Sequence, residues 1–241
     1  MKYIRTTEKV GASASLKFKE IKVLGDRRRA IAKLCAGKRV LVIGCVDMME
    51  IISLNEFVSS GDHQFYNISK VAEKAVGIDI NDDGVKALKE QGMVAEACDI
   101  MGGICDCFDE DYDIVVVSHV IEHVLDMYGF IKKIQQKIKF KEMILAVPNA
   151  YNTRSVIPSI LLRREQVSND HYYAFTPVTF LKFVQGLGME VKELYFDSCW
   201  VRKGRDHPVL GLIWSFVVAV FSRHSGNIIV IARNKSHEES C

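Results

Sequence analysis

The chain has 241 residues, of which 49% are hydrophobic and 26% are charged. This length and composition suit one large domain with a sizeable buried core. The 32 basic and 30 acidic residues leave a formal charge of +2, so the overall charge gives no reason to expect nucleic-acid binding.

The cysteines favour a reducing compartment, because seven is an odd number and they are spread along the chain. The N-terminus also lacks the apolar core of a secretory signal. We therefore expect free thiols and a cytoplasmic protein. Cys105 and Cys107 form a CDC pair without a second pair at zinc spacing, so no metal is assigned to them.

Short apolar runs alternate with segments of helical pattern, which predicts a parallel sheet covered by helices. The runs that we expect to be strands are 39–44, 75–80, 93–97, 113–117, 143–147, 191–196 and 227–232. Asn81 is predicted to cap one helix, the apolar spacing over 130–138 predicts a second, and Thr176-Pro177 begins a third. The arginines at 27–29 are expected to lie on a solvated helix face.

Polar residues follow several of the expected strands. The apolar run at 114–117 changes abruptly into Ser118 and His119, followed by Glu122 and His123. Ligands of parallel sheets collect beyond the carboxyl ends of the strands, so these side chains are candidates for a site.

The turn after the first strand, Gly44-Cys45-Val46, lies where backbone amides would meet a nucleotide-like cofactor. Asp79 ends the second strand, and a carboxylate there can accept both hydroxyls of a ribose, so Asp79 and the following Ile80 are expected to bind the cofactor. A helix-capping aspartate is the alternative interpretation.

After the third strand, Asp99 is placed to accept a hydrogen bond from an adenine amino group, with Ile100 packing on the ring. An ordinary turn aspartate would give the same pattern. The evidence lies in the order of these features along the chain, each at the end of a successive strand.

In this order, VLVIGC, GIDIND, ACDI and DYDIVVVSHVIEHVLD resemble the motifs of the class I S-adenosylmethionine-dependent methyltransferases. AVPNAYN and DHYYAFTPVTFLKFVQGLGMEV resemble the segment after the fifth strand in small-molecule members. The resemblance runs from about residue 39 to 235. It implies S-adenosyl-L-methionine as cofactor and a Rossmann-like, doubly wound α/β fold whose seven-stranded, mostly parallel sheet has its last strand antiparallel.

We expect a single methyltransferase domain over 1–241. It would comprise a helical N-terminal extension (1–36), a cofactor-binding half (37–150) and a substrate-side half (151–241). One departure from the family pattern is the first turn, where GxGxG is replaced by Gly44, Val46 and Met48. The missing glycines favour an alternative, in which the chain keeps the fold as a non-catalytic binding module.

A second alternative is a zinc-dependent hydrolase, because His119-x-x-Glu122-His123 matches the H-x-x-E-H pattern of inverted zinc peptidases. Such an enzyme needs the motif on a long helix and a third ligand downstream. Here the motif follows a strand directly, so the hydrolase is the less favoured reading and we assign no metal.

The resemblance places Ser118 and His119 beside the methionine part of the cofactor. We expect His171 to be the base that takes a proton from a hydroxyl acceptor, and His119 is the second candidate. A structural histidine in a loop is the alternative for His171. The residues expected to face the substrate are His123, Asn149 and Tyr172.

The expected acceptor is a small molecule, sugar or glycolipid, methylated on oxygen. The fourteen residues 208–221 carry no charge and are too few to span a bilayer as a helix. We expect this segment to cover the substrate pocket, form a homodimer contact or lie at a membrane surface.

Overall fold

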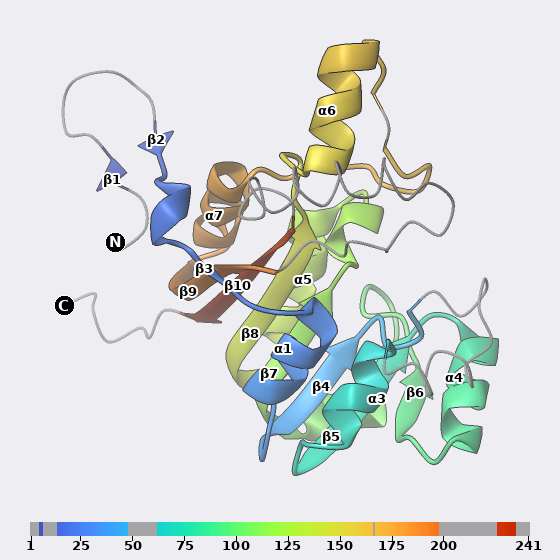
Figure 1. Cartoon of the computed structure of the whole chain (residues 1–241). Coiled ribbons are helices and arrows are strands. Elements are labelled where there is room, and N and C mark those ends of the chain that lie inside the picture. The colour runs from blue at the N-terminus through green and yellow to red at the C-terminus, as the bar shows by residue number, and fades with distance from the viewer. Residues whose placement is uncertain (1–4, 7–13, 48–61, 166, 198–225, 235–241) are drawn as a thin grey trace, which may run out of the picture.

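The computed structural model describes residues 5–6, 14–47, 62–165, 167–197 and 226–234, and its centre is one mixed sheet (Figure 1). The sheet has eight strands in the order β3-β9-β10-β8-β7-β4-β5-β6. Their bounds are Lys22–Val23 (β3), Met189–Phe196 (β9), Asn227–Asn234 (β10), Lys139–Pro148 (β8), Asp111–Ser118 (β7), Arg39–Ile43 (β4), Lys74–Asp79 (β5) and Ala95–Ala97 (β6).

The predicted sheet is confirmed. Strands β8, β7, β4, β5 and β6 run parallel, and β10 is antiparallel to both of its neighbours, β8 and β9. The eighth strand, β3, has two residues and extends the edge by pairing parallel with β9. A separate antiparallel pair is formed by β1 (Arg5–Thr6) and β2 (Ala14–Ser15).

Helices cover both faces of the sheet. The α-helices are α1 (Arg27–Leu34), α3 (Gln64–Ser69), α4 (Asp82–Glu90), α5 (Met127–Lys137), α6 (Thr153–Leu162) and α7 (Pro177–Gly186). The described residues also form three 3-10 turns: η1 (Phe18–Glu20), η2 (Asp106–Asp109) and η3 (Ile121–His123). Within the described part of the N-terminal extension, α1 is the one α-helix and the remainder forms β1, β2, η1 and β3.

The core has two layers because side chains alternate across each strand. In β4, Leu41 and Ile43 pack with residues of α5 and α7, whereas Val40 and Val42 pack with residues of α1, α3 and α4. Both faces of the central strands are therefore buried, which explains why they appear in the sequence as continuous apolar runs.

The helix starts follow from local capping. The side chain of Asn81 accepts a hydrogen bond from the backbone of Gly84 at the start of α4, as predicted. Thr176 caps α7 through the backbone of Thr179, with Pro177 in the first helical position. Both caps lie in loops at the edge of the sheet where the parallel strands end, so they fix the backbone of these loops.

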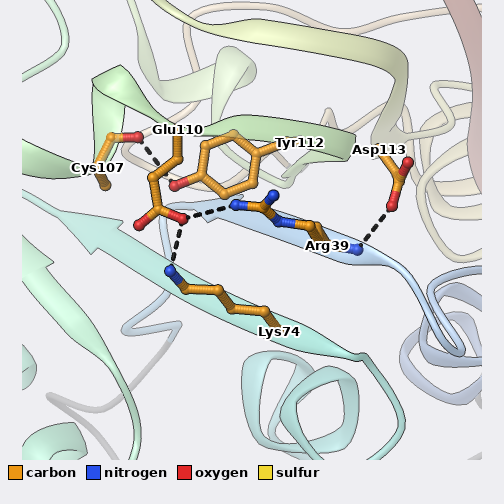
Figure 2. Close-up of polar contacts among 6 residues, drawn as sticks. All are labelled: Arg39, Lys74, Cys107, Glu110, Tyr112 and Asp113. Carbon is orange, nitrogen blue, oxygen red and sulfur yellow. Dashed lines mark hydrogen bonds and ion pairs between the residues drawn. The ribbon is translucent and has the colours of Figure 1, made fainter.

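An ionic cluster closes the opposite, amino-terminal edge of the sheet (Figure 2). Glu110 accepts hydrogen bonds from Arg39 (3.1 Å) and Lys74 (2.6 Å), the first residues of β4 and β5. Asp113 accepts from the backbone N–H of Arg39 at 3.0 Å. The hydrogen bond from Lys74 is the main cause that holds the pKa of Glu110 below its usual range.

Candidate cofactor and acceptor site

The carboxyl ends of four parallel strands meet at one edge. In register, Ile43 of β4 lies beside Ile78 of β5 and Val117 of β7, and Asp79 lies beside Ala97 of β6. The sequence-predicted residues that follow these strands are therefore neighbours at this edge, as the order of the motifs indicated.

The turn after β4 requires glycine at its first position. Gly44 has φ +74°, and a Cβ atom built on it would clash with a methyl group of Val120. The backbone N–H groups of Gly44 and Cys45 donate to the carbonyl of Ile78 at 2.9 and 3.2 Å. Both the conformation and the space thus exclude a side chain at Gly44.

Val46 stands where the family pattern has its second glycine, yet its side chain packs into the core. It is 2% exposed and lies against Gly84 of α4, where an added Cβ would collide with its methyl groups. Cys45, also predicted to be near the cofactor, is 1% exposed and contacts Gly77 of β5. The turn therefore buries both side chains, while Met48 lies outside the described residues.

Asp79 joins the turn after β4 to the turn after β5 through its two carboxylate oxygens. Oδ2 accepts from the N–H of Val46 at 2.9 Å, and Oδ1 accepts from the N–H of Asn81 at 3.0 Å. Asn81, rather than Asp79, caps α4, so the capping interpretation of Asp79 is not supported. Two carboxylate oxygens offer about four acceptor sites, which leaves capacity for ligand hydroxyls.

The residues expected to bind the cofactor differ in their exposure. Ile80 is 79% exposed, whereas Ile100 is 3% exposed and belongs to the hydrophobic core. The burial of Ile100 gives no support to the prediction that its side chain packs on a ring, and Ile80 is the accessible apolar side chain. Asp99 is exposed and accepts from the N–H of Met101 at 2.8 Å, as in a turn.

A disulfide joins Cys98 to Cys105 and closes the loop that holds Asp99. The expectation of free thiols is wrong for this pair, because the chain folds back between the two residues and brings their sulfur atoms together. Within the described residues, the free cysteines are Cys35, Cys45 and Cys107, all buried.

Ser118, at the end of β7, belongs to a hydrogen-bonded network that the sequence did not reveal. Its hydroxyl accepts from the guanidinium of Arg27 and donates to Gln64 at 3.1 Å. Arg27 is 8% exposed, so the expectation of a solvated face is wrong for this residue. Sequence reasoning missed this role of Arg27, because no pattern in the sequence distinguishes the buried Arg27 from Arg28 and Arg29.

His119 and Glu122 lie beyond Ser118. His119 has φ +57°, and its backbone N–H donates to Ala146 of β8 at 2.8 Å. The Glu122 side chain has 0% exposure, and Nδ1 of His119 lies 3.7 Å from one of its oxygens. Burial raises the pKa of Glu122 to about 7 and lowers the pKa of His119 well below its usual range.

A distant segment brings His171 to the same place. The N–H of Tyr172 donates to the carbonyl of Glu122 at 2.8 Å, which docks this segment onto η3. The rings of His171 and His123 lie edge to face with centroids 4.6 Å apart. Nδ1 of His123 pairs with Asp170 at 3.1 Å. Burial lowers the pKa of His171, and the nearby His123 lowers it further.

The two other residues expected to face the substrate differ in accessibility. Tyr172 is 62% exposed beside His171, whereas Asn149 is 3% exposed. The side chain of Asn149 accepts from the N–H of Tyr151 at 3.0 Å, and its backbone bridges to Phe175. Asn149 therefore holds the loop after β8 against the segment that carries His171.

The H-x-x-E-H motif does not lie on a long helix. Glu122 and His123 belong to η3, a 3-10 turn of three residues, and His119 precedes it in a left-handed conformation. Zinc peptidases present both histidines from one helix, so the hydrolase interpretation has no structural support here.

Similar folds occur among solved structures. A SAM-dependent methyltransferase from Archaeoglobus fulgidus is 20% identical over 86% of this chain and 90% of its own, with a TM-score of 0.52. Magnesium protoporphyrin IX methyltransferase from Synechocystis, with bound SAH, is 13% identical over 86% and 82% (TM-score 0.55). The N-methyltransferase NodS from Bradyrhizobium japonicum, in complex with S-adenosyl-L-homocysteine, is 12% identical over 87% and 86% (TM-score 0.51).

No protein-family model matches the sequence, and no curated protein matches it. The chain has the fold of the class I S-adenosylmethionine-dependent methyltransferases, as the sequence motifs indicated. In the described part of the chain no helix is both long and apolar enough to cross a membrane. The segment 208–221 lies outside the described residues.

Proposed function

We propose that this protein binds S-adenosyl-L-methionine and transfers its methyl group to an oxygen of a small acceptor, such as a sugar or a lipid-linked sugar. One observation carries the proposal: the glycine turn at Gly44 and the carboxylate of Asp79 lie at adjacent strand ends and are joined through the N–H of Val46. Within this fold, that edge is where a ligand of nucleotide type binds.

The cofactor's orientation follows from the strand ends. We place the ribose hydroxyls at Asp79 and the adenine over the exposed side chain of Ile80, within reach of Asp99. The methionine part then extends towards Ser118 and His119 at the end of β7. The guanidinium of Arg27, bound to Ser118, is available to pair with the methionine carboxylate.

The reaction is an in-line displacement. The acceptor oxygen forms a bond to the methyl carbon while the carbon–sulfur bond breaks, and the sulfur keeps the electron pair to give S-adenosylhomocysteine. A hydroxyl acceptor also loses a proton. His171 is our candidate for the base and His119 is the second, because burial lowers the pKa of both and keeps them neutral near pH 7.

A small acceptor is supported by the similar enzyme that methylates magnesium protoporphyrin IX. The preference for oxygen rests on the histidines beside the expected methyl position, because an alcohol needs a base more than an amine does. Tyr172, which is exposed beside His171, would contact the acceptor.

The test is calorimetric titration of S-adenosylmethionine and S-adenosylhomocysteine into the purified protein and two variants. Ile80→Glu replaces an exposed side chain, so folding should be unaffected while the adenine contact is lost. Burying an isoleucine against a ligand is worth about 1.5–3 kcal/mol, so we expect at least about tenfold weaker binding. Val71→Glu is the control, since Val71 is 43% exposed and its carbonyl accepts from Gly37 before β4, at the opposite edge.

Saturable binding that Ile80→Glu weakens and Val71→Glu leaves unchanged would support the cofactor site. It would justify a screen of hydroxylated acceptors with radiolabelled cofactor. Absence of binding to correctly folded wild-type protein would refute the proposal and favour the non-catalytic module.

A further inference from the structure

We propose that Glu122, His123 and His171 bind a divalent transition-metal ion beside the expected methyl position. The carboxylate and the two imidazoles each offer one ligand atom, and these three atoms lie within 4.8 Å of one another. The metal ligands in a protein site lie about 2.0–2.2 Å from the ion, so a small closing movement would bring all three atoms to one ion.

Glu122 supplies the strongest argument for a cation. Its side chain is completely buried, yet neither carboxylate oxygen accepts a hydrogen bond of ordinary geometry from the residues that the structure describes. Nδ1 of His119, 3.7 Å from one oxygen, is too far away for a hydrogen bond. A buried carboxylate that accepts no hydrogen bond is costly unless a charge compensates it. A bound cation between Glu122 and the histidines would provide that compensation.

His123 is held as metal-binding histidines usually are. Asp170 engages Nδ1 of His123 at 3.1 Å, which leaves Nε2 of that ring for an ion. Metal-binding histidines commonly pair their second nitrogen with a carboxylate in this way, which fixes the ring. Asp170 is itself held by the hydroxyl of Ser168.

His171 comes from a different part of the chain, and the backbone fixes its position. Its N–H donates to the carbonyl of Ser168 at 3.2 Å, and the next residue, Tyr172, donates to Glu122 at 2.8 Å. These bonds fix the backbone of His171 next to η3, and its ring packs edge to face on that of His123. Glu122 and His123 act with His171 in this arrangement, and His119 of the H-x-x-E-H pattern does not join the three ligands.

The kind of donor decides the kind of ion. Two imidazoles and one carboxylate form a set that suits zinc and neighbouring transition metals and leaves a position open for a substrate. Magnesium and calcium prefer oxygen ligands throughout. Zinc is therefore the first ion to test, with cobalt as a spectroscopic substitute.

The role of the ion rests on the proposed function. The open position would hold the acceptor's hydroxyl oxygen and lower its pKa, so that the proton passes to solvent. The oxygen would then attack the methyl carbon, and the sulfur would keep the electron pair of the broken bond. With the ion bound, His171 would be a ligand rather than the base.

The binding test uses the full chain without a histidine tag, after chelator treatment and dialysis. Zinc chloride is titrated calorimetrically into the wild-type protein, Glu122→Gln, His171→Ala and Asp170→Asn. We expect one saturable site that the first two variants weaken at least about 100-fold and Asp170→Asn weakens about tenfold to 100-fold. Glu165→Gln, an exposed carboxylate in the same loop, is the matched control and should bind as the wild type does.

Circular dichroism of each variant checks folding, and cobalt absorption reports whether nitrogen ligands surround the ion. Unchanged zinc binding in His171→Ala, or no saturable site in the wild type, would overturn the proposal. A second titration with S-adenosylmethionine separates the two proposals. Zinc binding without cofactor binding would refute the proposed function alone, and cofactor binding without zinc binding would refute the metal site alone.

Discussion

The contact between Val46 and Gly84 gives a sharp test of how the first turn is built. An alanine at Gly84 would normally stabilise a helix by about 0.5–1 kcal/mol. Here its Cβ would stand 2.8 Å from one methyl group of Val46 and closer still to the other. Val46 is β-branched and 2% exposed, so it cannot rotate away. Overpacking costs about 1–3 kcal/mol, so we expect Gly84→Ala to destabilise the protein by up to about 2 kcal/mol.

A double-mutant cycle isolates this contact. Val46→Ala alone removes two buried methyl groups and should cost about 1.6 kcal/mol or more. Combined with Gly84→Ala, it makes room for the new Cβ, so the double variant should be more stable than the sum of the singles by about 1–3 kcal/mol. Urea denaturation measures the free energy of unfolding of each variant, and its dependence on urea concentration should be the same in all of them.

Cofactor titration of the same variants connects packing with function. Gly84→Ala should weaken S-adenosylmethionine binding, because displacement of Val46 moves the N–H that Asp79 holds, and the double variant should recover part of the affinity. Additivity within about 0.5 kcal/mol, or stabilisation by Gly84→Ala alone, would refute the reasoning that Val46 is fixed against α4.

Three further variants test other features. Gly44→Ala should weaken cofactor binding by at least about tenfold in calorimetry, because the left-handed backbone costs about 1–2 kcal/mol and the new Cβ meets Val120; unchanged affinity would contradict this. Glu110→Gln should lower the free energy of unfolding at pH 7 by at most about 1 kcal/mol. Since the folded state lowers the pKa of Glu110, the difference should persist above about pH 4.5 and disappear as the pH falls further in urea titrations; a constant difference would count against the ion pairs. Cys105→Ser should lower the free energy of unfolding by about 2 kcal/mol, because the disulfide with Cys98 closes a short loop and restricts the unfolded chain. A reducing agent should abolish the difference from wild type in the same assay.

The strands were predictable because they are buried on both faces and end in polar residues. All seven expected strands are present, and the ends of β4, β5 and β7 lie within about one residue of the expected positions. The caps at Asn81 and Thr176 were predictable because capping is local. The side chain that accepts the hydrogen bond lies only three residues before the backbone N–H that donates it.

Tertiary contacts were not visible in the same way. The pairing of Arg27 with Ser118 joins residues 91 positions apart, and local patterns contain no information about it. The same holds for His123 and His171, which were expected in separate roles and lie with their rings in contact. Ile100 was assigned to the ligand because of its motif, whereas in the structure its apolar side chain is buried in the hydrophobic core.

Strand β10 has a consequence for how the chain folds during synthesis. Residues 227–234 insert between β8 and β9, which are formed by residues 139–148 and 189–196. A chain emerging from the ribosome therefore exposes two unpaired strand edges until β10 arrives. Such long-range pairing is slow and leaves those edges open to aggregation. Expression at low temperature or with chaperones should raise the yield of folded protein more than codon-level changes near the start of the chain.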